Sequence, residues 1–202
     1  GGKLPYLKET PSQTAGPYVH IGLAPMGAGL RVNGPQLGET IAGPEVSGQR
    51  IRIIGAVHDA DGAPVKDALI EVWQADAEGR YRHPEDPRGS EVEPGFTGWG
   101  RVVPDLSTGE FAFETVKPGL VPFRGNAMQA PHLTLWIVAR GINIGLHTRL
   151  YFADEEAANA ADPVLARVEP HRRETLLAVP ATAGYRFDIH LAGPAETVFF
   201  DI

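Results

Sequence analysis

The chain lacks cysteine, and this absence excludes two kinds of structure. Because none of its 202 residues is a cysteine, the chain can form neither a disulfide framework nor a thiolate metal site. Any metal ion would need ligands from His, Asp, Glu or Tyr. No stretch approaches the ~20 apolar residues of a membrane span, and the start, Gly1 to Pro5, lacks the apolar segment of a signal peptide. We therefore expect a cytoplasmic protein, although a processed precursor would look the same in this sequence.

The chain is also short of positive charge. It has 18 Lys and Arg against 25 Asp and Glu, so its net charge is −7, and the sequence contains no basic cluster. Nucleic-acid binding needs a basic face that displaces counterions, so no nucleic-acid partner is expected. The 24 Gly and 18 Pro imply many turns and argue against a helical bundle. A hydrophobic fraction of 43% over 202 residues is enough for one packed domain.

Strand patterns begin near residue 50. Apolar and polar residues alternate in some segments, as in half-buried strands, and other segments are apolar almost throughout, as in central strands. The Asp61-Gly62 turn predicts a tight connection between the first two strands. The predicted strands are 50–57, 68–74, 111–115, 133–138, 185–191 and 196–202.

Helix patterns are scarce. Residues 154–161 begin with acidic side chains and continue with alanines, and residues 162–165 begin with an N-cap aspartate followed by proline, so both predict short helices. Many short strands separated by turns predict an all-β fold, an antiparallel β-sandwich with short helices.

Residues 1–49 contain few periodic segments and many breakers. A connection of this length without its own structure is usually functional or wrapped around a partner. We expect an N-terminal arm, 1–49, that wraps a partner chain, and a β-sandwich domain, 50–202. A disordered tail is the alternative interpretation, although the apolar run Tyr18 to Ile21 gives the arm something to bury.

Histidine spacing gives little support for a local metal site. The chain has 7 His, and no two of them are spaced i, i+2 or i, i+4, the spacings that put two ligands on one face of a strand or helix. A site assembled from His132, His147 and a distant carboxylate stays open. Hydrolase and nucleotide-binding motifs are missing from the sequence.

Several motifs follow one another in an order that is similar to the intradiol ring-cleavage dioxygenases. The resemblance covers roughly residues 50–200, and ordered motifs are more specific than any one alone. It implies a ferric ion held by two tyrosines and two histidines, a catechol bound to that ion, and cleavage of the ring by dioxygen. The motifs are Glu71 to Tyr81, Gly100-Arg101, Gly109 to Gly119 and Thr148 to Phe152.

The resemblance implies that this chain has lost its metal ligands. The family places one tyrosine shortly after Lys-Pro-Gly and two histidines at i, i+2 on one strand. Here these positions hold Val121, His132 and Thr134, and no tyrosine lies between Tyr81 and Trp99, where the other tyrosine ligand would be. We therefore expect no catalytic residue and no metal in this chain, with His132 a buried structural histidine.

Three further segments narrow the resemblance to the chain without iron in members built from two related chains. They are 9–18, 139–144 and 196–201. The resemblance implies a homologous iron-bearing beta chain as partner, Fe(III) bound by that partner, a higher oligomer of such pairs and a small aromatic substrate. The alternative is a β-sandwich binding module of transthyretin-like or carbohydrate-binding type, with no enzyme attached.

The resemblance also implies residues that contact the substrate in the partner's pocket. A turn of small residues would line the pocket: Thr14, Ala15, Gly16 and Pro17. The alternative interpretation is a simple loop without a role in binding. Arg140 would meet a substrate carboxylate, since guanidinium offers paired donors in carboxylate geometry; a solvated strand end is the alternative. The roles of three other arginines are left unassigned: Arg101, Arg124 and Arg149.

Overall fold

The computed structural model describes residues 40–139, 145–182 and 184–201. Strands dominate this part of the chain, and the helical segments are short: one lies between β2 and β3, and the others lie between β8 and β9. The strands are β1 (Arg50–His58), β2 (Leu69–Gln74), β3 (Trp99–Val102), β4 (Glu110–Val116), β5 (Val121–Pro122), β6 (Met128–Gln129), β7 (His132–Val138), β8 (Leu146–Phe152), β9 (Leu177–Ala181), β10 (Gly184–Arg186) and β11 (Ile189–His190).

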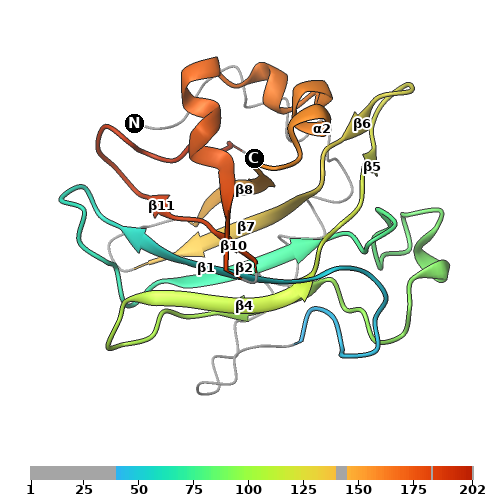
Figure 1. Cartoon of the computed structure of the whole chain (residues 1–202), viewed down its shortest axis with the longest axis horizontal. Helices are drawn as coiled ribbons and strands as arrows, with labels where there is room; N and C mark the ends of the chain where they lie inside the picture. Colours follow the sequence, from blue (N-terminus) through green and yellow to red (C-terminus); the bar gives the residue numbers. More distant parts are fainter. Residues whose placement is uncertain (1–39, 140–144, 183, 202) are drawn as a thin grey trace.

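The described strands form a 9-stranded sheet in the order β11-β1-β10-β9-β8-β7-β2-β3, with β4 paired to β1, and a separate 2-stranded hairpin, β5-β6. The main core contains residues from β1 and β4 together with residues from β2, β7 and β8, so the two halves of the folded sheet pack face to face (Figure 1). The fold is therefore mostly β and sandwich-like.

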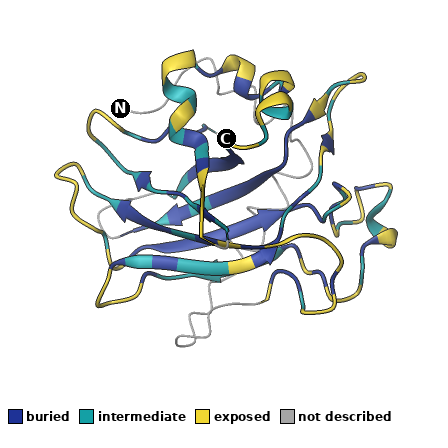
Figure 2. Cartoon of the chain, viewed as in Figure 1, coloured by how far each residue is buried: buried dark blue, intermediate teal, exposed yellow. Residues whose placement is uncertain are grey.

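The central strands have the composition expected of their place. All six residues of β2 are buried, as in a strand covered on both faces. On β2 and β7, Ile70, Val72 and Leu135 belong to the main core. Because side chains alternate along a strand, the residues between them point to the other face. Figure 2 shows the burial of these strands.

The prediction of a purely antiparallel sheet was wrong in part. The pairs β2–β3, β2–β7, β7–β8 and β1–β4 are antiparallel. The pairs β1–β10, β1–β11 and β8–β9 are parallel. The turn at Gly62 does form, since Asp59 N donates to Ala63 O at 2.9 Å, but β1 and β2 are not neighbours in the sheet.

The C-terminal strands also differ from the prediction. The expected strand 185–191 is divided into β10 and β11, because Asp188 between them turns its carboxylate to the backbone N–H of Ala56, at 3.0 Å. No strand forms in the described residues 196–201. There Thr197 N bonds to His190 O at 2.9 Å and Phe200 N to His147 O at 2.8 Å, so the segment is fixed to two different strands.

Short helical segments cover the end of the sheet near β8 (Figure 1). They enclose a second apolar cluster, which includes Ala130, Tyr151, Leu176 and Phe200. Within the described ranges, no helix is long and apolar enough to cross a membrane. The segments are α2 (Glu156–Ala161) and the 3-10 helices η3 (Leu165–Arg167) and η4 (Pro170–Leu176), whereas the 3-10 helix η2 (Gly89–Glu91) lies elsewhere, between β2 and β3.

The predicted domain boundary at residue 50 coincides with the first residue of β1. Immediately before it, Ile41, Ala42 and Val46 are buried in the main core, so residues 41–46 pack on the domain. Most of the expected arm, residues 1–39, lies outside the described residues. That this arm wraps a partner chain stays a prediction.

Candidate functional site

The three positions predicted to be degenerate ligand positions, Val121, His132 and Thr134, lie around one side chain, Arg149. On β7, His132 is directly opposite Tyr151 and Thr134 is directly opposite Arg149. Directly paired residues share a face of the sheet, and residues two apart on a strand do too, so these four side chains lie together. Val121 lies on β5 of the β5–β6 hairpin, opposite Gln129 on β6, and Gln129 hydrogen bonds to Arg149.

Arg149 is buried to 1% exposure in the middle of β8. Its Nη1 donates to Oε1 of Gln129 at 2.9 Å and to the hydroxyl of Tyr151 at 3.0 Å. Its Nη2 is buried and has no hydrogen-bond partner among the described residues. Since both of its partners are neutral, the guanidinium charge has no carboxylate in direct contact there.

His132 is a neutral imidazole in this setting. Burial, and then the positive charge of Arg149, lower its pKa to about 3. A neutral ring donates from one nitrogen only, and here Nδ1 donates to the carbonyl of Ala130 at 2.7 Å. The ring lies 5.6 Å, centroid to centroid, from that of Tyr151.

Asp162 joins the backbone before β7 to the backbone at the start of η3. Its Oδ2 accepts from Ala130 N at 2.7 Å, and its Oδ1 accepts from Val164 N and Leu165 N, both at 2.8 Å. The hydroxyl of Tyr151 also donates to Oδ1, at 3.3 Å. Burial raises the pKa of Tyr151, which therefore stays a neutral bridge between the guanidinium and the carboxylate.

Val121, which is predicted from the sequence to stand at a tyrosine-ligand position, fills an apolar position in the structure. It is 1% exposed and packs in a small cluster with Ala75 and Tyr81. Gly79 has φ +76, and a Cβ there would lie 1.8 Å from Leu120 O, so only glycine allows this turn to approach β5. The close approach sets Val121 against the cluster.

These residues do not fit a ferric ion. Valine offers no donor atom, and the Arg149 guanidinium places a positive charge where a metal cation would have to bind. Among the residues that the structure describes, no group of three or more His, Cys, Asp or Glu side chains could hold a metal ion. The residues of the alternative metal site, His132 and His147, are far apart. His147 lies opposite Trp136, and Trp136 is four residues, or about 13 Å, along β7 from His132.

The same face of the sheet continues as a polar row. Arg101, Glu71, Trp136 and His147 lie on adjacent strands in direct register. Glu71 Oε1 lies 3.6 Å from Arg101 Nε, and Trp99 Nε1 donates to Glu71 Oε2 at 3.5 Å. Burial raises the pKa of Glu71 more than these two neighbours lower it.

His147 closes this row on β8. Burial, and then Arg149, lower its pKa to about 3, and both of its ring nitrogens lack a hydrogen-bond partner among the described residues. It lies 5.9 Å, centroid to centroid, from Trp136. Its place on the sheet is therefore held by packing.

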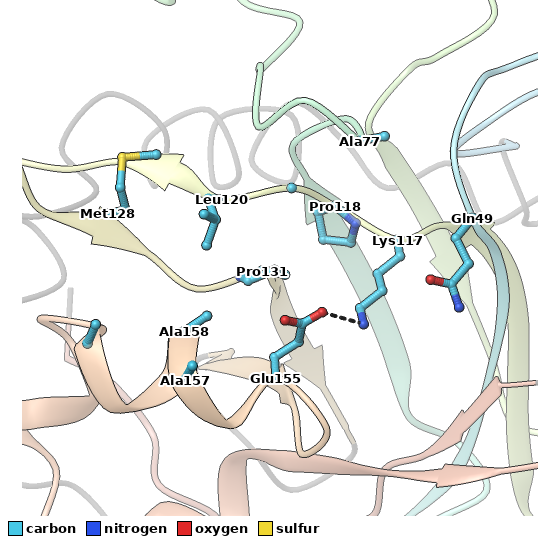
Figure 3. Close-up of a pocket in the computed structure, with 12 residues that line it drawn as sticks. Gln49, Ala77, Lys117, Pro118, Leu120, Met128, Pro131, Glu155, Ala157 and Ala158 are labelled. Atoms are coloured by element: carbon cyan, nitrogen blue, oxygen red, sulfur yellow. Dashed lines mark hydrogen bonds and ion pairs between the residues drawn. The ribbon is translucent and has the colours of Figure 1, made fainter.

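A cavity of about 680 Å³ opens beside the degenerate positions. Figure 3 shows Leu120 and Met128 on the hairpin side and the alanines of α2 opposite them. The charge of Lys117 is balanced by Glu155, because Lys117 Nζ lies 2.7 Å from Glu155 Oε1. The cavity is therefore an apolar recess without a free charge for a carboxylate.

The residues predicted to bind substrate lie outside the described residues. These are Thr14, Ala15, Gly16, Pro17 and Arg140, and their roles stay predictions. The sequence interpretation missed Arg149, Gln129 and Asp162 as one connected cluster. A signal existed, since Arg149 lies in the strand segment 146–152 directly before Leu150, Tyr151 and Phe152, and an arginine is rarely fully buried unless it is paired.

Comparison with known proteins agrees with this fold. The family model described as Dioxygenase matches residues 33–193, and the chain belongs to the intradiol dioxygenase family. It is similar to the protocatechuate 3,4-dioxygenase alpha chain of Pseudomonas putida, 48% identical over 200 residues that cover 96% of this chain and 97% of that one.

Two further relatives help to place the chain. It is 32% identical over 204 residues to the protocatechuate 3,4-dioxygenase beta chain of Burkholderia cepacia, covering 96% of this chain and 83% of that one. Among solved structures, catechol 1,2-dioxygenase from Acinetobacter sp. ADP1 matches with a TM-score of 0.58 and 20% identity, over 74% of this chain and 55% of that one. At that identity the match supports the fold alone.

Proposed function

We propose that this chain is the alpha subunit, without iron, of a protocatechuate 3,4-dioxygenase. That reaction joins 3,4-dihydroxybenzoate and O2, opens the ring between the hydroxylated carbons and gives 3-carboxy-cis,cis-muconate. One combined observation carries the proposal: similarity to an alpha chain over nearly the full length, together with a buried guanidinium, that of Arg149, among the degenerate ligand positions.

In this proposal Fe(III) is bound by a homologous beta chain and not by this chain. The similarity to a beta chain supports a partner of the same fold, and related chains commonly pair about a pseudo-twofold axis. Permanent interfaces of this kind bury about 2,000 Å² or more. Several such pairs then assemble into a higher oligomer.

The contribution of this chain is to complete the partner's substrate pocket. Thr14, Ala15, Gly16 and Pro17 line it, and Arg140 meets the substrate carboxylate with paired donors. A buried carboxylate without a cation would cost several kcal/mol. The catechol oxygens occupy the metal, so the cation must come from elsewhere in the pocket.

The test is to purify this chain alone and together with the homologous beta chain of the same organism. We expect the chain alone to hold no stoichiometric iron and to cleave no catechol, and the co-purified pair to be coloured by ferric iron and active. Iron, colour and turnover in the chain alone would contradict the proposal. So would a stable monomer that ignores the partner in gel filtration, which is the outcome that a non-enzymatic binding module predicts.

A further inference from the structure

Three hydrogen-bond donors lie in one row beside the degenerate positions. Trp73 is directly opposite Thr134, and Thr134 is directly opposite Arg149. All three side chains therefore point to the same face, with neighbouring Cβ atoms about 5 Å apart. Arg149 Nη2 and Trp73 Nε1 are both buried and have no hydrogen-bond partner among the described residues.

The nearby carboxylates are engaged elsewhere. Glu71, two residues before Trp73, faces Trp99 at 3.5 Å and Arg101 at 3.6 Å. Asp162 accepts from three backbone N–H groups and reaches Arg149 only through the Tyr151 hydroxyl. The row thus holds one full positive charge and donors, with no acid of the described chain in direct contact.

A buried charge without a counter-ion is costly, and a buried donor without an acceptor adds to the cost. Both costs are removed by one ligand that is negatively charged and accepts several hydrogen bonds. A carboxylate has this chemistry, because its two oxygens accept from a guanidinium and from neighbouring N–H or O–H groups.

We infer that the row formed by Trp73, Thr134 and Arg149 is a binding site for a small carboxylate anion of the size of formate or acetate. Thr134 stands between its two neighbours in the row and adds a hydroxyl donor. The guanidinium repels cations, and the face that in the family pattern holds a metal cation takes an anion in this chain.

The inference does not rest on the proposed function, because every group in the row belongs to this chain. Its test uses the full-length chain, together with any partner that co-purifies. Formate is titrated at pH 7 against chloride at equal ionic strength, and the thermal midpoint and tryptophan fluorescence are followed. Formate at ten times its Kd should raise the midpoint by about 3–6 °C above the chloride reference.

Matched variants assign the effect to the row. Arg149→Met should abolish the formate response, and Trp73→Phe, which keeps the ring and removes only the N–H, should weaken formate binding by about 10-fold or more, as expected for a hydrogen bond to a charged acceptor. Thr134→Val, which keeps the shape, should weaken it to a similar extent. Arg186→Met on β10 is the control and should respond like the unmodified chain.

If Arg149→Met does not fold, Trp73→Phe and Thr134→Val decide. Equal responses to formate and chloride in the unmodified chain would overturn the inference. So would formate binding that neither mild variant weakens, or a crystal structure with a protein carboxylate against Nη2. A co-purified pair of unmodified chains that cleaves no protocatechuate would instead contradict the proposed function, whatever its response to formate.

Discussion

Arg149 and Gln129 are joined by a 2.9 Å hydrogen bond from Nη1 to Oε1, which ties β8 to the β5–β6 hairpin. Gln129 holds one orientation, because its Nε2 donates to Pro122 O at 3.4 Å. The amide oxygen therefore always faces the guanidinium. In this way a neutral side chain fixes a buried charge and the hairpin at the same time.

Replacing Gln129 with Leu should lower the free energy of unfolding by about 2–4 kcal/mol, because the buried guanidinium loses one of its two acceptors. Urea denaturation measures the loss. The double variant with Arg149→Met should regain part of it, with a coupling of about 1–3 kcal/mol. Gln49→Leu, on an exposed glutamine, is the matched control and should change stability by no more than about 0.5 kcal/mol. A Gln129 variant as stable as this control would show that the bond contributes nothing.

Replacing Asp162 with Asn should destabilise the chain by about 2–4 kcal/mol, because an amide nitrogen would face a donor where the carboxylate accepts four hydrogen bonds. The exposed Asp105 accepts from Ser107 N and Thr108 N in a similar local turn, so Asp105→Asn is the control and should lose less. Equal losses in urea midpoints would mean that burial of Asp162 is unimportant.

Acid should destabilise the chain through His132 and His147. Their native pKa values are lowered from 6.5 to about 3, so the unfolded chain binds more protons and stability falls as the pH drops from 6.5 towards 3. Each histidine contributes up to about 1.4 kcal/mol per pH unit in that window. His147→Phe should therefore reduce the pH slope of the urea midpoint without loss at pH 7. His171→Gln, on an exposed histidine, should leave the slope unchanged.

Replacing Arg140 with Ala, in the complex with the partner chain, should raise KM for protocatechuate about 10-fold or more, as expected for loss of a charge-assisted hydrogen bond of ~1.5–3 kcal/mol. Catechol lacks the carboxylate, so its steady-state constants should change much less. Equal effects on both substrates, or none, would make Arg140 a structural residue.

The sequence was sufficient to predict several strands because their patterns are local. The predicted run 133–138 begins one residue after the start of β7, and 50–57 ends one residue before the end of β1. The parallel pairs could not be predicted, since periodicity says which face a residue takes and not which strand lies beside it.

The degenerate positions could be predicted, but their surroundings could not. Motif order assigns Val121, His132 and Thr134 as degenerate positions, and that assignment stays a prediction. Gln129 meets Arg149 only because the hairpin folds back over the sheet. The contact joins residues 20 positions apart, and no local pattern encodes it. Two members of the cluster carried a sequence signal: Arg149 is a charged residue inside the strand segment 146–152, and Asp162 has the N-cap pattern followed by proline.

The parallel pairing of β1 has a consequence for the order of folding. Residue 52 lies opposite residue 184, and residue 57 opposite residue 189. One edge of β1 thus stays without its neighbours until the last strands are available, and contacts that distant in sequence slow folding because a long loop must close first. During refolding that open edge can pair with another molecule, so the chain should refold best when dilute.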